Sequence, residues 1–272
     1  MKILIKNKDI NEALKKVSNL GFVPTMGSLH KGHEYLIKQS QKRCKQTLVS
    51  IFINPTQFNN EDDFSSYPKT IDDDISKLEN IGCNLLFLPE VQEIYPKGLA
   101  KKKIVNNFRN ILCDKFRPGH FDGVTTVVDL FFNMIKPTNS YFGEKDFQQV
   151  KIIQDLVKIN HHNIKIIQCP SVRDKMGMSL SSRNSKFSND QLKIFNVLGN
   201  KIKEHINLLK QNEINNFDQL KIELLQNNIN KIDYLEIRNE NNLEITKNYS
   251  EARLFIALYI GEIRIIDNFK LY

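Results

Sequence analysis

The stretch LGFVPTMGSLHKGH (residues 20–33) decides the fold, because it joins a short apolar run to a glycine-containing loop and then to the start of a helix. Residues 20–25 are the apolar run, and helical spacing follows over residues 34–44. The next apolar run, TLVSIFI (residues 47–53), is continuous and rich in β-branched residues. Such a run is expected of a strand that is buried on both faces of a parallel sheet.

Strands and helices continue to alternate along the first part of the chain. The N-terminal residues 1–9 alternate Lys with Ile and are predicted to form a strand. Further on, the patterns predict helices over residues 72–81, 124–135 and 147–159, and strands over residues 84–88 and 164–169. This alternation indicates an α/β fold with a parallel sheet wrapped by helices.

The pattern changes after Arg183. Two polar, amphipathic helices are predicted at about residues 189–211 and 216–227, and three strand-like runs follow over residues 231–238, 252–260 and 262–266. Gly261 lies between two of these runs and indicates a hairpin. Helices followed by antiparallel strands are typical of a smaller α+β domain. The boundary is therefore placed at residue 175, giving domains 1–175 and 176–272.

The composition is that of a globular protein, with 40% hydrophobic and 26% charged residues. No apolar stretch is long enough to cross a membrane, and the N-terminus does not resemble a signal peptide, so we expect a cytoplasmic protein with no membrane partner. The cysteines are scattered and lie in or beside apolar runs, which predicts reduced core residues. They are Cys44, Cys83, Cys113 and Cys169.

The formal net charge of +8 raises the alternative of a nucleic-acid-binding protein. Lys and Arg are spread along the chain, however, and the longest basic run covers only residues 101–103. A nucleic-acid-binding protein would show aromatic platforms interleaved with basic residues and salt-sensitive binding to random DNA. A mildly basic surface also attracts nucleotides and carboxylates. We therefore expect small anionic substrates and no nucleic acid.

The strongest candidate for a functional motif is His30-x-Gly32-His33, which follows a buried strand and begins a helix. This is the usual position of ligands on an open α/β sheet. Two imidazoles beside a helix N-terminus can donate hydrogen bonds to phosphate oxygens. Gly27 permits a tight exit from the strand, and Gly32 leaves room for an adenine or ribose. A histidine-containing turn that merely caps the helix would give the same short motif.

A second motif, INPTQF (residues 53–58), also follows a buried strand. The amides of Asn54 and Gln57 can hold a substrate that carries hydroxyl and carboxylate groups. The structural alternative is a turn at Pro55 that leaves Gln57 in solvent. The position of this motif, at the same predicted sheet edge as the histidines, favours the functional interpretation.

Two further segments carry candidate phosphate ligands. YFGEKDFQQV (residues 141–150) would form a loop at a helix start, with Lys145 reaching phosphates and Gln149 facing the same cavity, although a solvated helix start explains it equally well. VRDKMGMSLSSRN (residues 172–184) contains a serine–arginine cluster suited to phosphates and to departing pyrophosphate. Gly177 would let this loop move, and a plain flexible linker is the alternative.

Other polar residues support weaker interpretations. RPGHF (residues 117–121) is either a substrate-side loop or a turn, and residues 72–74 are three Asp that either approach Mg²⁺ or form an acidic helix start. His161 and His162 are predicted at the surface, and His205 is predicted to be solvated on a polar helix.

In this order and spacing, the four segments resemble the pantothenate synthetase (pantoate–β-alanine ligase) family. Matching pieces also occur in EDDFSSYPKT (residues 61–70), RPGHFDGVTTVV (117–128), IDYLEIRNENNLE (232–244) and IIDN (265–268). The resemblance spans essentially the whole chain. The HxGH pattern alone would indicate only the wider nucleotidylyltransferase superfamily.

The resemblance implies a Rossmann-like N-terminal domain, a smaller C-terminal domain that closes over ATP, a homodimer, and Mg²⁺ accompanying ATP. It implies that ATP is bound by Met26, Gly27, Ser28, Leu29, His30, Lys31, Gly32, His33, Gly143, Glu144, Lys145, Asp146, Val172, Leu180, Ser181, Ser182 and Arg183. The expected catalytic groups are His33, His30, Lys145, Ser181, Ser182 and Arg183. Gln57 and Gln149 would hold pantoate, with Gln57 also near β-alanine.

The implied reaction joins pantoate to β-alanine through a pantoyl-adenylate, releasing pyrophosphate and then AMP. Departures from the family pattern are Ser28, Lys31, Asn59, Asn60, Ser179 and Leu180, the last two standing where the family more often has Ala and Met. The main alternative is another HxGH nucleotidylyltransferase, which would use a phosphate-bearing acceptor and ignore β-alanine. Such an acceptor would favour Arg or Lys in place of INPTQF and GEKDFQQ.

Overall fold

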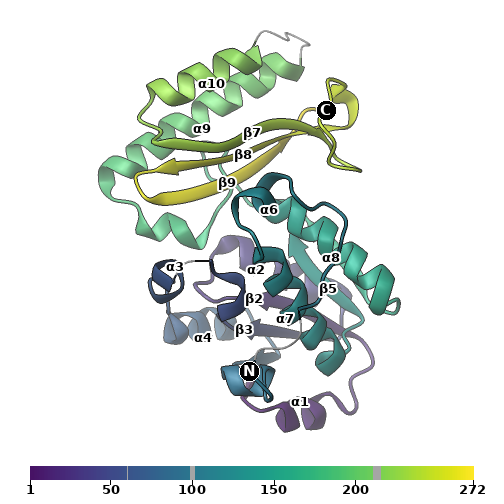
Figure 1. Ribbon diagram of the computed structural model, residues 1–272. Coiled ribbons are helices and arrows are strands. Elements are labelled where there is room, and N and C mark those ends of the chain that lie inside the picture. Colours follow the sequence, from purple (N-terminus) through teal and green to yellow (C-terminus); the bar gives the residue numbers. More distant parts are fainter. Residues whose placement is uncertain (60, 99–101, 211–215) are drawn as a thin grey trace. The chain divides into compact units, whose positions relative to one another are not determined.

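The computed structural model describes residues 1–59, 61–98, 102–210 and 216–272. The chain divides into two compact units, Met1–Pro170 and Ser171–Tyr272. The first unit, coloured from purple to teal in Figure 1, is built on a six-stranded, all-parallel sheet. The strand order is β1-β4-β3-β2-β5-β6. The predicted α/β class with a second, smaller unit is confirmed.

The strands of the first unit are short, as is usual in parallel sheets. They are β1 (Lys2–Leu4), β2 (Leu20–Thr25), β3 (Gln46–Ile51), β4 (Leu85–Phe87), β5 (Asn139–Gly143) and β6 (Lys165–Cys169). The helices are α1 (Asn7–Leu14), α2 (Lys31–Arg43), α3 (Glu61–Ser65), α4 (Ile71–Asn80), α5 (Val91–Ile94), α6 (Leu112–Phe116), α7 (His120–Ile135) and α8 (Phe147–Asn160).

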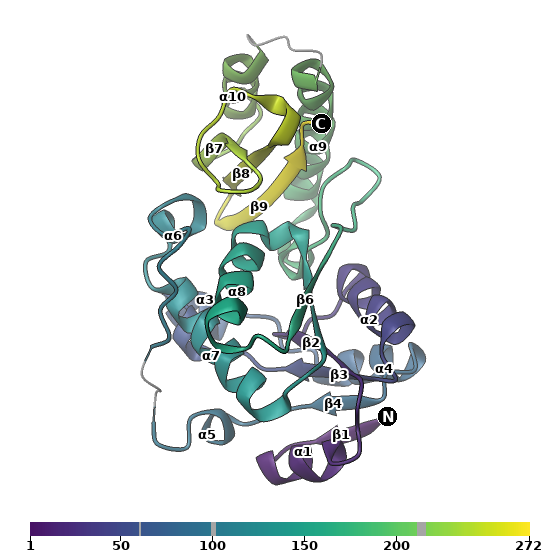
Figure 2. The same ribbon diagram turned by 90° about the vertical axis from the view of Figure 1, so that its right-hand side faces the viewer.

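Both faces of the central strands are buried, which explains their continuous apolar sequence. Phe22 of β2 lies on one face, where its ring centroid is 5.7 Å from that of Phe131 in α7. The next residue, Val23, lies on the other face in a cluster with Leu36 and Ile37 of α2. Figure 2 shows α7 and α8 on one side of the sheet and α2 and α4 on the other.

The strand order reverses at β2. Beyond β3 the chain adds β4 to one side of the sheet, whereas β5 and then β6 lie on the other side of β2. In a parallel sheet, the loops on either side of such a reversal diverge and leave a crevice at the carboxyl ends of the strands. The loops that follow β2, β3 and β5 contain three of the candidate motifs.

Two parts of the first unit differ from the sequence prediction. The N-terminal strand ends at Leu4 and is followed by helix α1, so the prediction of one strand over residues 1–9 was wrong beyond its start. Strand β5 was not predicted, because Asn139 and Ser140 give it a polar beginning. Its strand conformation is stabilised by pairing with β2 and β6 on both sides.

The second unit contains an antiparallel sheet in the order β7-β8-β9 and two helices. Its elements are α9 (Asn189–Lys210), α10 (Asn216–Gln226), β7 (Lys231–Asn239), β8 (Ala252–Ile260) and β9 (Ile263–Lys270). The hairpin at Gly261 is confirmed, and β9 extends beyond the predicted end at residue 266. The predicted end of the first helix, Gln211, lies outside the described residues.

Two histidines are more buried than predicted. His205 is only 4% exposed, and its Nε2 lies 3.3 Å from Glu223 Oε2 of α10, so the prediction of a solvated side chain was wrong. The His161 ring lies 2.8 Å from Asp129 and packs edge-on against Phe132, which contradicts a surface position, whereas His162 is exposed. Each buried ring is paired with a carboxylate from another helix.

All four cysteines are buried and free, as predicted for reduced core residues. Among the described residues, no helix combines the length and apolar character that spanning a membrane requires.

Candidate active site at the carboxyl ends of β2, β3 and β5

The two motif histidines form the N-terminal cap of α2. His30 is the N-cap residue, and its Nδ1 accepts the Gly32 N–H at 3.1 Å. The Nδ1 of His33 accepts the His30 N–H at 3.3 Å. An imidazole that accepts through Nδ1 carries its proton on Nε2 when it is neutral. Both rings, whose centroids are 4.1 Å apart, therefore offer an Nε2–H donor.

This capping arrangement gives a structural reason for the glycines of the motif. A Cβ on Gly32 would lie 2.7 Å from Cε1 of His30, so any side chain there would displace the capping ring. Gly27 has a φ of +83°, in the left-handed region that favours glycine, and it makes the tight exit from β2 that was predicted. The capping interpretation and the ligand interpretation are thus compatible, because capping uses Nδ1 and leaves Nε2 available.

Both imidazoles are held in the neutral form. Burial, and to a smaller extent the nearby Lys145 charge, lowers the pKa of His30 from 6.5 to about 4. The pKa of His33 is also well below its usual value, mainly because the ring is buried. His30 and then Lys145 lower this pKa by smaller amounts. The influence of Lys145 on both rings indicates that the loop after β5 lies near the loop after β2.

We expect these shifts to destabilise the free protein in acid. A histidine whose pKa is lower in the folded state contributes stability above its unfolded pKa of 6.5 and loses it as the pH falls toward the folded value. For His30 the full effect is at most about 3 kcal/mol. His30→Asn, a neutral cap, should flatten the decline in unfolding free energy between about pH 6.5 and pH 4 in urea titrations.

The matched control is His162→Asn, which changes an exposed imidazole outside the site. It should keep the wild-type slope of unfolding free energy against pH. An unchanged slope in His30→Asn would contradict the assignment of a depressed pKa to His30.

The loop between β2 and α2 is held by a buried carboxylate from α4. Asp74 is 0% exposed, and its two oxygens each accept a backbone N–H at 2.7 Å, from Ser28 and from Leu29. Lys77, one turn further along α4, donates to the Leu29 carbonyl at 2.9 Å. The three acidic residues at the start of α4 thus differ: residues 72–73 are exposed, whereas Asp74 is buried and binds the backbone of the motif loop.

The loop after β3 lies against the motif loop. Gln57 is buried, not in solvent, and its Nε2 donates to the sulfur of Met26. Asn54 is also buried, and its amide is bonded within the protein: it donates to the Gly123 carbonyl and accepts from Thr56 and Tyr95. The two strand-end loops therefore meet, with Asn54 fixing the shape of the second one.

The start of α7 is tied to the same loop. The ring of His120 lies 2.7 Å from the Gln57 carbonyl, and Arg117 donates to that carbonyl at 3.4 Å. The RPGHF segment is therefore in contact with the second candidate loop. Asn59 donates to the carbonyl of Pro118, and Asn60 lies outside the described residues.

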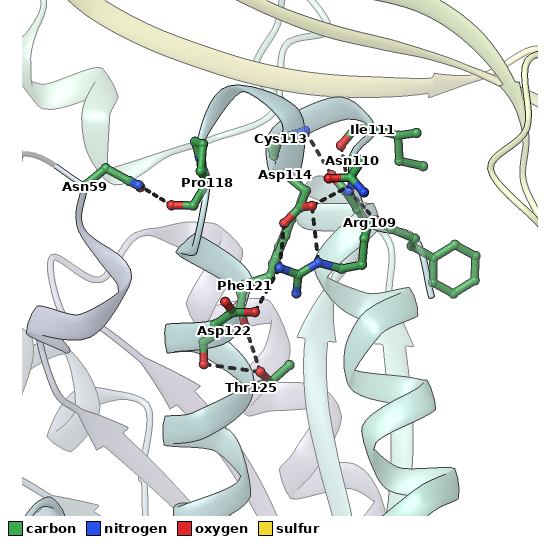
Figure 3. Close-up of polar contacts among 12 residues, drawn as sticks. Asn59, Arg109, Asn110, Ile111, Cys113, Asp114, Pro118, Phe121, Asp122 and Thr125 are labelled. Carbon is green, nitrogen blue, oxygen red and sulfur yellow. Dashed lines mark hydrogen bonds and ion pairs between the residues drawn. The ribbon is translucent and has the colours of Figure 1, made fainter. Parts of the chain in front are cut away.

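A partly buried ion-pair cluster anchors the segment that precedes α7. Figure 3 shows the guanidinium of Arg109 lying between two carboxylates, with Nη2 at 3.2 Å from Asp114 Oδ1 and 2.8 Å from Asp122 Oδ1. Asp114 belongs to α6 and Asp122 to α7. Gln148 of α8 also binds this segment through the carbonyls of Phe108 and Ile111. The cluster thus joins α6, α7 and α8 beside the Gln57 loop.

The third loop follows β5. Glu144, Lys145 and Asp146 form a short 3-10 helix, and α8 begins at the next residue. The Lys145 ammonium lies 3.4 Å from Asp146 Oδ1, and the Lys145 side chain as a whole is 20% exposed. Gln149 lies in the first turn of α8 and is partly buried. In the sheet, β5 lies beside β2 on the side opposite β3. The loop after β5 is therefore on the other side of the point where the strand order reverses.

The serine–arginine segment belongs to the second unit. Ser181 Oγ accepts the Arg183 N–H at 3.2 Å and caps a 3-10 helix that begins at Ser182. The Leu180 N–H donates to the Val172 carbonyl at 3.0 Å, which makes the segment a hydrogen-bonded turn and not an open linker. Gly177 occupies the left-handed position of that turn.

The predicted nucleotide ligands of the first unit fall into two groups. One group lies mostly in the loop after β2 and the other mostly in the loop after β5, and these two strands are adjacent in the sheet. The side chain of Leu29 is buried in the core, so only its backbone could contact a nucleotide. The side chain of Lys31 is exposed. The sequence did not identify Asp74 as an anchor of the motif loop. The available signal was its helical spacing with Leu78, which places both residues on the buried face of α4. Among the described residues, no group of three or more His, Cys, Asp or Glu could hold a metal.

Comparisons with known proteins agree along the whole chain. Residues 2–270 match the family model described as pantoate-beta-alanine ligase. A protein named pantothenate synthetase from Clostridium botulinum (strain Loch Maree / Type A3) is 38% identical, covering 99% of both chains. One from Francisella tularensis subsp. novicida is 42% identical, covering 96% of this chain and 92% of its own length.

Solved structures are also similar. The pantothenate synthetase of Thermus thermophilus has a TM-score of 0.94 and 32% identity, covering all of both chains. A pantoate-beta-alanine ligase from Francisella tularensis, described as complexed with "Beta-gamma ATP and Beta-alanine", has a TM-score of 0.87 and 37% identity, covering 100% of this chain and 98% of that one.

Proposed function

Because this chain belongs to the pantoate–β-alanine ligase family, we propose that it joins pantoate to β-alanine at the expense of ATP, at the sheet edge where β2, β3 and β5 end. The enzyme is an AMP-forming ligase of pantothenate biosynthesis, and ATP is its co-substrate.

One observation supports this site more than any other. Two neutral imidazoles present Nε2–H donors at the N-terminus of α2, and Gln57, on the neighbouring loop, contacts Met26 of the motif. Donors for phosphate and an amide for a polar acid are thus brought together at one edge of the sheet. Adenylation requires the acid and the nucleotide to bind next to each other, and this edge of the sheet offers donors for both.

In the first step, a carboxylate oxygen of pantoate attacks the α-phosphorus of ATP, and the bond to pyrophosphate breaks. The carboxylate is already ionised at neutral pH, so the step needs no general base. Catalysis then depends on positioning and on stabilising the charge of the transferring group. His30, His33 and Lys145 are the donors of the first unit. Neutral imidazoles add hydrogen bonds here, and Lys145 adds positive charge.

In the second step, the β-alanine amine attacks the carbonyl of the mixed anhydride, an amide bond forms, and AMP leaves with the electron pair of the broken C–O bond. The amine must lose a proton before or during this attack. Gln57 and Gln149 hold pantoate in both steps. Ser181, Ser182 and Arg183 bind the phosphates that depart as pyrophosphate, and the second unit closes over ATP to keep water from the adenylate.

Mg²⁺ fits this site as a companion of the nucleotide. The oxygens of Asp74 are occupied by backbone N–H groups, and no set of three or more candidate ligands was found among the described residues. Mg²⁺ commonly keeps several waters and binds through substrate phosphates. It would neutralise triphosphate charge there. We also propose that the enzyme is a cytoplasmic homodimer.

A single assay tests the proposed function. The protein is supplied with pantoate, β-alanine and Mg-ATP, and the formation of AMP and of the amide product is followed together. We expect both to appear in equal amounts, and labelled pyrophosphate to exchange into ATP when pantoate is present without β-alanine. Exchange that needs a phosphate-bearing acceptor and ignores pantoate would instead indicate a nucleotidylyltransferase.

A further inference from the structure

The segment that carries the serine–arginine cluster is a compact hairpin. Arg173 and Ser179 face each other across an antiparallel bridge, and the Asp174 N–H donates to the Met178 carbonyl at 2.8 Å. The Asp174 side chain accepts the N–H groups of Met176 and Met178, both at 2.9 Å, and so closes the turn. The second arm of this hairpin leads from Ser179 directly to the cluster.

One buried carboxylate of β9 holds both arms of the hairpin. Asp267 is 3% exposed, and its Oδ2 accepts the Ser179 N–H at 2.7 Å and an Arg173 N–H at 3.0 Å. Its Oδ1 accepts the Ser179 hydroxyl and the Asn268 N–H. A carboxylate that accepts four hydrogen bonds fixes its partners tightly, because charge-assisted bonds are the stronger kind.

Arg173 completes this anchor. Its Nη2 donates to the Asn268 carbonyl at 2.6 Å, its Nη1 donates to the Gly177 carbonyl at 2.8 Å, and its guanidinium lies 4.3 Å from the ring centroid of Phe269. Arg173 on the first arm and Ser179 on the second therefore attach the hairpin to β9, and the bond from Arg173 to Gly177 ties the tip to the first arm.

We propose that Asp267 is a positioning residue for the reaction, acting through the hairpin to fix the register and direction of Ser181, Ser182 and Arg183. This inference rests on the proposed role of those three residues at the phosphates. Ser179 is two residues before Ser181, so the anchored N–H sets where the first donor lies. Catalysis by preorganised donors is sensitive to displacements of about 1 Å, which can cost ~100-fold in rate.

Ser179 makes two bonds to Asp267, because its hydroxyl bond supplements the bond from its backbone N–H. Ser179→Ala removes the hydroxyl and keeps the backbone N–H. Asp267→Asn keeps the shape of the side chain. It leaves only one acceptor oxygen, however, where the donors now use both oxygens of the carboxylate, and it removes the charge that pairs with Arg173.

The test compares Asp267→Asn with Asp233→Asn in the full-length protein. Asp233 is a matched control: its side chain is 2% exposed against 1% for Asp267, and it also pairs with an arginine, Arg264, at 2.8 Å. Both variants should lower the unfolding temperature. At a temperature where both are folded, Asp267→Asn should lower pantoate-dependent pyrophosphate exchange ~10-fold to ~100-fold, and Asp233→Asn should leave it near wild type.

A double-mutant cycle separates positioning from a merely structural role. Because Asp267 is proposed to position Arg183 together with Ser181 and Ser182, Asp267→Asn should cost less exchange activity in an Arg183→Ala background than in the wild type. Equal losses in both backgrounds would overturn the proposal. So would wild-type exchange in folded Asp267→Asn. If that variant does not fold, Ser179→Ala decides: we expect a loss of about 3-fold, and no change would refute the proposal. Wild-type protein without exchange would instead refute the proposed function.

Discussion

His33→Ala should lose ~100-fold or more of pantoate-dependent pyrophosphate exchange while keeping its fold. The His33 ring is fixed at the third position of α2 by the His30 N–H, so its Nε2–H points away from the helix cap with little freedom. Such a donor stabilises the charge that develops on the phosphate only if it is already in place. Removing one donor of this kind costs on the order of 3 kcal/mol in the transition state.

The measurement is exchange of labelled pyrophosphate into ATP with pantoate present and β-alanine omitted, which isolates the adenylation step. Alanine also removes the acceptor of the His30 N–H, so unfolding free energy should fall by only about 1 kcal/mol. The exposed His162→Ala is the control and should retain full exchange. Normal exchange in folded His33→Ala would refute the assignment of His33.

Asp74→Ala should reduce both stability and activity. The change leaves the N–H groups of Ser28 and Leu29 without their acceptor, and each buried, unsatisfied donor costs about 1–3 kcal/mol. We therefore expect a loss of about 2–5 kcal/mol in unfolding free energy. Exchange activity should also fall at temperatures where the variant is folded, because the loop that begins the HxGH motif loses its anchor.

The control for Asp74 lies two residues earlier on the same helix. Asp72→Ala removes an exposed carboxylate from the first turn of α4 and should change unfolding free energy by no more than about 0.5 kcal/mol. Urea titration measures both variants. Equal stability of the two would show that the bonds from Asp74 to the motif loop contribute nothing, and the loop-anchoring role would have to be abandoned. Asp74→Asn should lie between them, because it keeps one acceptor oxygen.

These predictions follow from the position of the site at the reversal of strand order. The loops after β2 and β3 are joined by the contact between Gln57 and Met26, and the charge of Lys145 reaches both imidazoles from the loop after β5. The loops after β2 and β3 are also supported from outside the site, by Asp74 on α4 and by His120 on α7 respectively. The supports are as important as the donors, because a displaced donor contributes little.

Much of the fold around the candidate site could be predicted from local sequence. Strands β2 and β3 were recognised because central strands of a parallel sheet are apolar on both faces, and the motifs that follow them are contiguous. Strand β5 was missed because its polar first residues give no such pattern. The burial of His161 and His205 was missed for a related reason: each is buried by pairing with a carboxylate on another helix, Asp129 or Glu223.

The sequence by itself determined the fold class, most of the strands and helices, the family and the segments that contain candidate ligands, because those signals lie within a few consecutive residues. Only the tertiary structure decided which polar residues turn inward. Asp74 and Asp267 look like ordinary carboxylates in the sequence, yet each is buried against N–H groups far along the chain, at Ser28 and Ser179. A buried charge is tolerated only where partners meet it, and folding alone brings those partners together.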